Sequence, residues 1–189
     1  MRPVFPTGRI FAAATLLRPV LNEDSGYIKA WLNNPEVMRF WGGLSETVSD
    51  EQSRTWVAGY VSAGNQKACL VIEAGGVPVG FILLSCETGD ANYRHKVEVD
   101  ICIGDPSRWN SGLGTDALTA LLRWIFTSTD VVRVYLQPRS VNARAVHVYE
   151  KVGFKKEGTV RNGEMIDGVL YDCVMMGALR DEWLAEFGR

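Results

Sequence analysis

The stretch from Asp105 to Thr115, which we call the glycine loop, combines glycines, hydroxyls and an arginine directly ahead of a predicted helix. A helix start carries unpaired backbone N–H groups at the positive end of the helix dipole, so it attracts anions. Gly112 and Gly114 would let the backbone approach a phosphate, and Arg108 could add a positive charge. The loop lacks both the GK[ST] ending of a P-loop and the third glycine of a dinucleotide fingerprint. An anion site and a plain tight turn are therefore both open.

A tyrosine-bearing helix and an acidic strand are the other candidates for chemistry. Asn142 can cap a helix, and the spacing of Ala145 and Tyr149 places a small side chain and a phenol on one face of that helix. Taken alone, this segment favours a tyrosine packed in the core. Glu98 and Asp100 lie on one face of a predicted strand, where they form either a pair of catalytic carboxylates or an exposed charged surface.

The elements that must position these residues form a predicted mixed α/β fold. Residues 97–103 alternate apolar and polar side chains, as a strand with one buried face does, and the glycine loop joins this strand to a helix over 113–126. No repeat or linker divides the chain, so we expect a single domain over residues 1–189. The other predicted strands are 10–18, 67–74, 77–86, 131–136, Phe154 to an Asn162-Gly163 turn, and 168–177, and the other helices begin near Asn22, Pro35, Ser49 and Asn142.

The composition argues against several classes of protein. Among 189 residues, 20 Lys and Arg oppose 22 Asp and Glu, and this net charge of −2 argues against a general nucleic-acid binder. No apolar stretch approaches the ~20 residues that span a bilayer, so no membrane partner is expected. The four cysteines lack CxxC spacing, which predicts reduced thiols in a cytoplasmic protein. With only two histidines, no metal site is expected.

The charges are nevertheless uneven along the chain. Acidic residues gather in 87–105 and basic residues in 139–156. These segments are either ordinary solvated faces or two parts of one site, with a basic rim for an anionic cofactor and an acidic mouth for a cationic acceptor.

The glycine loop and the tyrosine-bearing helix together resemble the GCN5-related N-acetyltransferases, the GNAT family. Trp109–Ala117 is similar to the family's acyl-CoA pyrophosphate loop, [QR]-x-x-G-x-[GA], in the form that begins with tryptophan. Asn142–Phe154 fills every fixed position of the family's N-x-x-A-x-x-x-Y-x-x-x-G-F segment. Trp31–Val37 and Tyr171–Met175 resemble the branch that contains ribosomal-protein N-terminal acetyltransferases, and the resemblance covers about residues 15–180.

The resemblance implies a GNAT fold, in which a central, mostly antiparallel sheet with flanking helices splays between its fourth and fifth strands. Here those strands are 97–103 and 131–136, and the fourth would pair with the pantetheine arm of acetyl-CoA. No metal is implied. The residues that the resemblance assigns to cofactor binding are Ile101, Cys102, Ile103, Arg108, Trp109, Asn110, Ser111, Gly112, Leu113, Gly114, Thr115, Asn142, Ala145 and Lys151.

The resemblance also assigns catalytic roles. Tyr149 would be the general acid for the departing thiolate, since a tyrosine pKa near ~10 suits that transfer. Asp100 resembles the strand aspartate of aminoglycoside 6'-N-acetyltransferases, and Glu98 matches a position that is often a carboxylate, so either residue, or a water, is the candidate base. Asp100→Asn should then lose rate mainly at low pH, where deprotonation of the amine limits. Phe40 and Trp41, together with Asp100, would contact the acceptor.

The implied function is an acetyl-CoA-dependent N-acetyltransferase that acts on a primary amine by direct attack in a ternary complex. The acceptor is a protein N-terminus or a small-molecule amine. An aminoglycoside 6'-N-acetyltransferase that confers antibiotic resistance is the alternative, and a non-catalytic CoA-binding homologue is a third. A nucleotide-binding regulator would instead use the glycine loop for ATP or NAD. A homodimer is suggested only by the apolar tail that contains Trp183.

Overall fold

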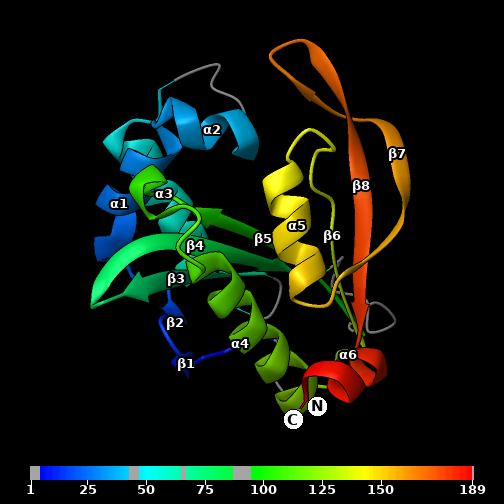
Figure 1. Ribbon diagram of the computed structural model, residues 1–189. Coiled ribbons are helices and arrows are strands. Elements are labelled where there is room, and N and C mark those ends of the chain that lie inside the picture. Colours follow the sequence, from blue (N-terminus) through cyan, green and yellow to red (C-terminus); the bar gives the residue numbers. More distant parts are fainter. Residues whose placement is uncertain (1–4, 43–46, 65–66, 87–94, 189) are drawn as a thin grey trace.

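The computed structural model describes residues 5–42, 47–64, 67–86 and 95–188, which form one mixed sheet with helices on both faces (Figure 1). The sheet order is β1-β2-β3-β4-β5-β6-β8-β7, in agreement with the predicted α/β class. The strands are β1 (Ile10–Phe11), β2 (Leu16–Pro19), β3 (Lys67–Ala74), β4 (Val77–Ser85), β5 (Lys96–Ile103), β6 (Arg133–Leu136), β7 (Lys155–Ile166) and β8 (Val169–Leu179). The helices are α1 (Ser25–Leu32), α2 (Pro35–Trp41), α3 (Asp50–Val61), α4 (Leu113–Ser128), α5 (Ala143–Lys151) and α6 (Arg180–Phe187), with 3-10 turns η1 (Asn22–Asp24) and η3 (Pro106–Arg108).

The central strands β5 and β6 separate after a short paired segment. Their parallel register covers Lys96–Glu98 on β5 and Arg133–Tyr135 on β6, and the two strands part beyond it. On its other edge β5 stays paired with β4 as far as Ile103. The other neighbouring pairs in the described sheet are antiparallel. The predicted splay is confirmed, because β5 and β6 are the strands predicted at 97–103 and 131–136.

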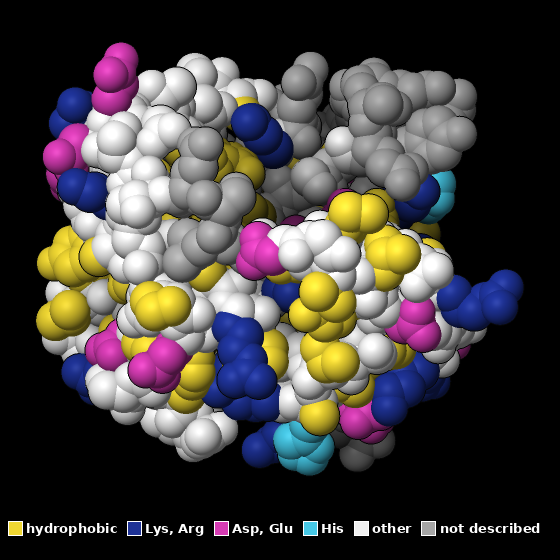
Figure 2. All heavy atoms as spheres, turned by 90° about the horizontal axis from the view of Figure 1, so that it is seen from above, with side chains coloured by type: hydrophobic (Ala, Val, Ile, Leu, Met, Phe, Trp, Pro, Cys, Tyr) yellow, Lys and Arg dark blue, Asp and Glu magenta, His cyan; other side chains and the backbone are white. Residues whose placement is uncertain are grey.

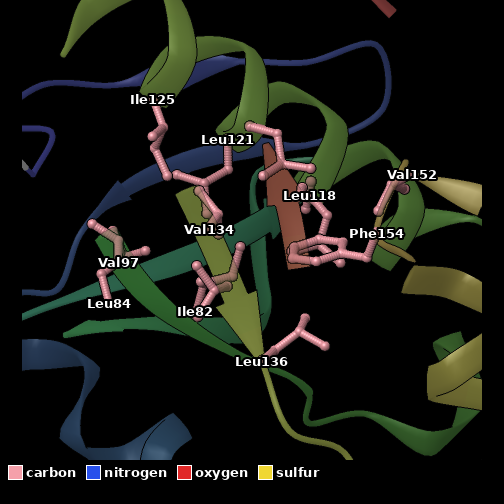
Figure 3. Packing of buried hydrophobic residues seen from close by; sticks show 14 of the residues in the cluster. Ile82, Leu84, Val97, Leu118, Leu121, Ile125, Val134, Leu136, Val152 and Phe154 are labelled. Atoms are coloured by element: carbon pink, nitrogen blue, oxygen red, sulfur yellow. The ribbon is translucent and has the colours of Figure 1, made fainter. Parts of the chain in front are cut away.

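The core on the α4 side of the sheet keeps the parting strands in place. Aliphatic side chains from β4, β5 and β6 pack against one face of α4, where apolar residues recur at helical spacing (Figure 3). Burial of each such side chain contributes about 1.5–3 kcal/mol relative to exposure. The buried side chains labelled in Figure 3 are Ile82, Leu84, Val97, Leu118, Leu121, Ile125, Val134, Leu136, Val152 and Phe154.

The opposite face of the sheet is covered by α1, α2 and α3 over an aromatic cluster. Phe81 of β4 is fully buried at its centre. Trp31 of α1 stacks on Phe81 at 6.1 Å between ring centroids, and Trp41 of α2 meets it edge-on at 5.0 Å. Trp56 of α3 lies 5.7 Å from the same ring. These contacts fix α2 beside β5, where one wall of the candidate site is built.

Two helix starts follow the sequence signals. The Asn34 side chain accepts a hydrogen bond from the Glu36 N–H at 3.0 Å, directly before Pro35, as expected for a cap with proline in the first turn. Ser49 and Gln52 exchange reciprocal bonds of 3.2 and 2.7 Å, which completes the predicted capping box. At Asn22 the prediction is wrong in detail, because Asn22–Asp24 forms a 3-10 turn and α1 begins at Ser25.

The strand predicted at 10–18 is interrupted. β1 and β2 are joined by a turn in which the Asp116 carboxylate of α4 accepts hydrogen bonds from the N–H groups of Ala13, Ala14 and Thr15, at 3.2, 2.9 and 2.8 Å. These backbone donors therefore bond a side chain distant in sequence instead of a neighbouring strand. Such a long-range partner has no local sequence signal.

The hairpin turn predicted at Asn162-Gly163 is wrong. β7 continues to Ile166, and the chain reverses at Asp167 and Gly168, whose φ values of 48° and 78° are left-handed. Both Asn-Gly and Asp-Gly favour such a turn, and tertiary pairing selects the second. Asn162 instead lies in a bulge, where the β7–β8 register shifts between Val160 and Glu164.

The tail that contains Trp183 is helix α6, packed on the same molecule. Trp183 is 2% exposed, and its indole N–H donates to the Val152 carbonyl at 2.8 Å. Its ring lies 5.7 Å from that of Phe126 in α4. The expectation that Trp183 belongs to a partner surface is therefore wrong, since its apolar surface is already covered.

Gly104 directly follows β5, and a Cβ there would lie 2.1 Å from Cγ of Trp31. We expect Gly104→Ala to lower the free energy of unfolding by about 2–3 kcal/mol, because the buried indole has little space to move. Urea unfolding measures this change. The control is Gly26→Ala on the exposed side of α1, where a Cβ meets nothing within 4 Å and alanine should be neutral or slightly stabilising. Equal stability of the two variants would contradict the prediction.

In the described part of the chain, no helix is long and apolar enough to cross a membrane. The same residues contain no group of three or more His, Cys, Asp or Glu side chains that could hold a metal ion. The four cysteines are free thiols. Burial raises the pKa of Cys102 to about 12, so this thiol stays neutral although it lies in β5 beside the candidate site.

Candidate active site

The divergence of β5 and β6 opens a cavity of about 630 Å³, which we call the active-site cavity. Its walls come from β5, the glycine loop, α2, α5, the β6–α5 connection and one residue of β7. Figure 2 looks onto the upper end of the molecule as drawn in Figure 1, and Lys and Arg side chains gather near the centre of this face. Helices, strands and loops that are distant in sequence thus line one cavity.

The glycine loop forms one end of the cavity. Gly112 caps α4 with a left-handed φ of 84°, so its Cβ-free backbone makes a turn that other residues rarely adopt. Asn110 is also left-handed, at 61°. The first N–H groups of α4 have no partner within the helix and lie at its positive end, an arrangement that suits a phosphate group. The predicted loop residues that line the cavity are Arg108, Trp109, Asn110, Gly112, Leu113, Gly114 and Thr115.

Ser111 differs from the other predicted loop residues. It is not among the residues that line the cavity. Its hydroxyl donates a hydrogen bond to the Arg108 carbonyl, so the side chain braces the loop from within. Its predicted role as a cofactor contact has no support from the cavity lining.

The long walls of the cavity are an open strand edge and the face of α5. Ile101, Cys102 and Ile103 line it from the part of β5 that has left β6. Their backbone groups on that edge are available to an extended, amide-bearing ligand, which can add to a sheet edge as a strand does. The facing residues Asn142, Ala145 and Lys151 also line the cavity, and the Asn142 Oδ1 accepts from the Ala145 N–H at 3.2 Å as the cap of α5.

Asp100 and Tyr149 both line the cavity, and they lie near enough for the charge of Asp100 to act on the phenol. Asp100 is open to the cavity yet enclosed by protein on most sides, and this burial, together with the charges of Glu98 and Glu164, raises its pKa to about 6. Tyr149 is 7% exposed. Its burial, followed by the charge of Asp100, raises the pKa of the phenol above its ordinary value. At neutral pH the site therefore holds an ionised carboxylate and a protonated phenol.

The structure distinguishes the two candidate bases, Glu98 and Asp100, by their positions relative to the cavity. Asp100 lines the cavity and Glu98 does not, although the charge of Glu98 acts on Asp100. The alternation of the strand places both carboxylates on one face, as predicted, but only Asp100 lies beyond the point where β6 departs. This geometry favours Asp100 as the residue that meets a ligand.

Phe40 and Trp41 line the cavity from the end of α2. Trp41 is held by its edge contact with Phe81, so this wall is supported by the aromatic cluster of the core. The acids Glu87 and Asp90, which contributed to the predicted acidic mouth, lie outside the described residues. The carboxylates that line the described cavity are Asp100 and Glu164, and the lining also holds Arg108, Arg139, Arg144 and Lys151.

Glu164 was not predicted from the sequence. The bulge in β7 carries it into the cavity lining, where the Arg139 Nε lies 3.2 Å from its Oε2. Arg139 is 4% exposed and lies over the Tyr171 ring at 5.4 Å, so it holds the Glu164 carboxylate from behind. The Asp167-Gly168 pair is the signal that could have revealed Glu164, because a turn there extends β7 past residue 164.

An enzyme that moves an acyl group from a phosphorylated carrier to an amine must hold an anion, an extended amide chain and a cation in one continuous cavity. The active-site cavity offers a place for each, which puts the chain in the class of carrier-dependent acyltransferases. The family model described as an acetyltransferase (GNAT) domain matches residues 15–155, most of the chain. The chain belongs to this family, and it is an acetyl-CoA-dependent N-acetyltransferase.

Named relatives agree with this assignment. The chain is 27% identical over 153 residues to an aminoglycoside N(6')-acetyltransferase type 1 from Klebsiella pneumoniae, covering 76% of this chain and 75% of that protein. It is 28% identical over 176 residues to the spermidine N(1)-acetyltransferase of Escherichia coli strain K12, covering 93% and 91%. A spermidine N-acetyltransferase from Vibrio cholerae, solved with CoA and spermine, superposes with a TM-score of 0.77 at 25% identity over 90% of this chain and 98% of that one.

The fold is also that of AAC(6')-Ib, solved with ribostamycin and coenzyme A. The TM-score is 0.78 at 22% identity, with 92% of this chain and 98% of that chain covered. The relatives thus include enzymes named for two different amine substrates.

Proposed function

We propose that this enzyme transfers the acetyl group of acetyl-CoA to a primary amine of a small, polycationic molecule by direct attack in a ternary complex. The observation that carries the proposal is that Asp100, Glu164 and Tyr149 line the same cavity as the α4 N-terminus, with the charge of Glu164 acting on Asp100 and that of Asp100 on Tyr149. Two carboxylates favour a cationic acceptor, and a protonated phenol faces the place where a leaving group would need a proton.

The residues present fit acetyl-CoA. The free N–H groups at the start of α4 suit its pyrophosphate, and the open edge of β5 with the cap residue Asn142 suits its pantetheine amides. When bound, acetyl-CoA supplies a thioester whose carbonyl carbon is electrophilic. A backbone N–H on the open edge of β5 would donate to the oxygen of that carbonyl, where negative charge develops.

Asp100 is the proposed general base. With a pKa of about 6 its carboxylate is ionised at neutral pH, yet it is more basic than an ordinary aspartate. It accepts a proton from the acceptor ammonium, directly or through a water, so that the nitrogen lone pair forms the new N–C bond. Glu164 is paired with Arg139 through Oε2, and its other carboxylate oxygen would accept from an ammonium group of the acceptor.

Tyr149 is the proposed general acid. As the C–S bond breaks, its Oη donates a proton to the sulfur. The raised pKa of the phenol keeps that proton in place over the working pH range, and burial by α5 and Phe154 restricts the ring. The nitrogen loses a second proton as the amide forms, and this proton, passed directly or through water, restores the Tyr149 phenol. A free CoA thiol and an acetylated amine are then the products.

An aminoglycoside is the finer acceptor proposal. The Phe40–Trp41 wall offers flat apolar surface to a sugar ring, while Asp100 and Glu164 bind its ammonium groups. A relative named as an aminoglycoside acetyltransferase supports this choice, and one named as a spermidine acetyltransferase supports a polyamine. A protein N-terminus and a non-catalytic role are the other outcomes that the following measurement distinguishes.

Thiol release from acetyl-CoA, followed with kanamycin, spermidine and short peptides, tests the proposal. We expect turnover with a polycationic amine, with kanamycin the best of the panel. In Glu164→Gln the KM for that amine should rise about tenfold, since one charge-assisted contact is lost, while the KM for acetyl-CoA stays constant. The amide still accepts from Arg139 but removes the counter-charge of this buried arginine, so the thermal midpoint is measured beside the KM values.

Turnover with peptides alone would assign the protein N-terminus, and CoA binding without any turnover would assign the non-catalytic role. Asp130→Asn, an exposed acid between α4 and β6 that does not line the cavity, is the control and should leave both KM values unchanged.

A further inference from the structure

Arg144, the second residue of α5, is a cation that lines the active-site cavity without a carboxylate partner. Among the ion pairs of the described residues none involves Arg144, and the pKa of its guanidinium is lowered by burial alone. Its guanidinium carbon instead lies 3.9 Å from the ring centroid of Trp109 and 5.5 Å from that of Phe40. An uncompensated charge at a cavity wall is poised for an anionic ligand.

Trp109 is a fixed platform beneath this guanidinium. Its indole N–H donates to the Ile103 carbonyl at 2.8 Å, which ties the ring to the end of β5. The ring belongs to the glycine loop, so the stacking contact holds an arginine of α5 at the loop from across the cavity. Because Arg144 lies on α5 and Trp109 on the loop, this contact joins two walls of the cavity.

The loop's own arginine is less available. Arg108 Nε lies 3.9 Å from the Asp105 Oδ2, and about half of each side chain is exposed to solvent, at 51% and 42%. Water and the neighbouring carboxylate therefore screen its charge. Arg144 is also exposed to solvent, so what distinguishes it from Arg108 is that no described carboxylate pairs with it and that the Trp109 ring holds its guanidinium at the loop.

We propose that Arg144 binds the pyrophosphate of acetyl-CoA from the α5 side, opposite the backbone N–H groups of α4, and that Trp109 is the positioning residue that holds its guanidinium there. The inference rests on the proposed use of acetyl-CoA at this cavity. It adds a side-chain contact from a different helix to the backbone contacts of the glycine loop. The phosphates would then be held from both walls, and their binding would connect α5 to the loop.

Calorimetric titration of the whole protein with CoA and with dephospho-CoA, which lacks the 3'-phosphate, tests this assignment. Arg144→Met should weaken both ligands by about ten- to a hundredfold, as loss of a charge-assisted contact does, and Arg144→Lys should restore part of the affinity. Arg54→Met on the exposed face of α3, outside the cavity lining, is the matched control and should change neither affinity.

Trp109→Leu tests the platform. Alone, this change should weaken CoA binding about two- to fivefold, because a cation–π contact is lost. In the Arg144→Met background it should cause no further loss of affinity. A Trp109→Leu loss of equal size in both backgrounds would show that the indole acts without Arg144, and would overturn the positioning role.

Two other results would overturn the pyrophosphate contact. A loss seen with CoA and not with dephospho-CoA would move Arg144 to the 3'-phosphate. Unchanged affinity for both, with an altered KM for the amine, would move it to the acceptor. If the wild-type protein bound neither ligand, the proposed function itself would fail, and this result is distinct from those two.

Discussion

Replacing Tyr149 with phenylalanine should lower kcat by about 10²- to 10³-fold, the largest loss expected for a single atom of this enzyme. The phenol is buried, its pKa is raised, and it lies at the cavity wall with Asp100, so no solvent group can readily replace its proton. Binding should change little, and the KM for acetyl-CoA should stay within about threefold because the ring remains in place. Steady-state kinetics at saturating amine measure both quantities.

Tyr27→Phe is the matched control for Tyr149→Phe. Tyr27 lies on α1, is 45% exposed and does not line the cavity, so its hydroxyl should be dispensable. The thermal midpoint of Tyr149→Phe should stay close to that of the wild type, since the ring contact with Phe154 is kept. A Tyr149→Phe enzyme with nearly normal kcat would exclude the phenol as the proton donor and leave water in that role.

Asp100→Asn should lower kcat/KM by about 10²-fold at pH 8, where the wild-type base is ionised. The pH profile identifies the mechanism. Below its pKa of about 6 the wild-type carboxylate takes up a proton, so wild-type kcat/KM should fall about tenfold for each further pH unit. Asp100→Asn should not show this fall, because it has no carboxylate at this position. The ratio of wild-type to variant kcat/KM should therefore decrease as the pH falls through 6.

The sequence placed the greatest loss at low pH, and burial of Asp100 reverses that expectation. An aspartate surrounded only by water would stay ionised to about pH 4. With the pKa raised, the wild type loses its own base at low pH, and the largest difference moves to pH values above 6 at which the acceptor amine is still protonated.

The thermal stability of Asp100→Asn shows whether its lower activity comes from a lost catalytic group or from unfolding. The pKa of Asp100 is raised from 3.8 to about 6, so the folded state favours the protonated form. Ionisation therefore costs stability as the pH rises through this range. The neutral amide avoids that cost, and Asp100→Asn should melt no lower than the wild type at pH 8. Parallel pH profiles of the two enzymes would contradict the role of Asp100 as the base.

The fold follows closely from local patterns in the sequence. The alternation in 97–103 gives β5, the Ser49–Gln52 capping box starts α3, and Gly153 ends α5 with a φ of 98°. Each of these features depends on residues within a few positions of one another. The interrupted first strand depends on Asp116, about a hundred residues away, and the choice of Asp167-Gly168 over Asn162-Gly163 depends on pairing with β8.

The site follows from the sequence only where one segment supplies it. The glycine loop and Tyr149 lie on contiguous motifs, and Tyr149 and the predicted loop contacts other than Ser111 line the cavity as expected. Glu164 was assigned no role, and Arg144 was included only in the basic segment 139–156, because their surroundings are created by tertiary contacts, with Arg139 for one and with Trp109 for the other. Burial of Asp100, which sets its pKa, is likewise a property of the assembled walls.

The bulge in β7 makes the acceptor side of the cavity sensitive to chain length. Val160 pairs with Cys173 and Glu164 pairs with Tyr171. Between these two pairs β7 advances by four residues and β8 by only two. Adjacent residues of a strand face opposite sides, so deleting one residue within the bulge would replace Glu164 by a neighbour of different chemistry. An insertion or deletion at this point could redirect substrate choice in one genetic event, without any change to the residues that perform the chemistry.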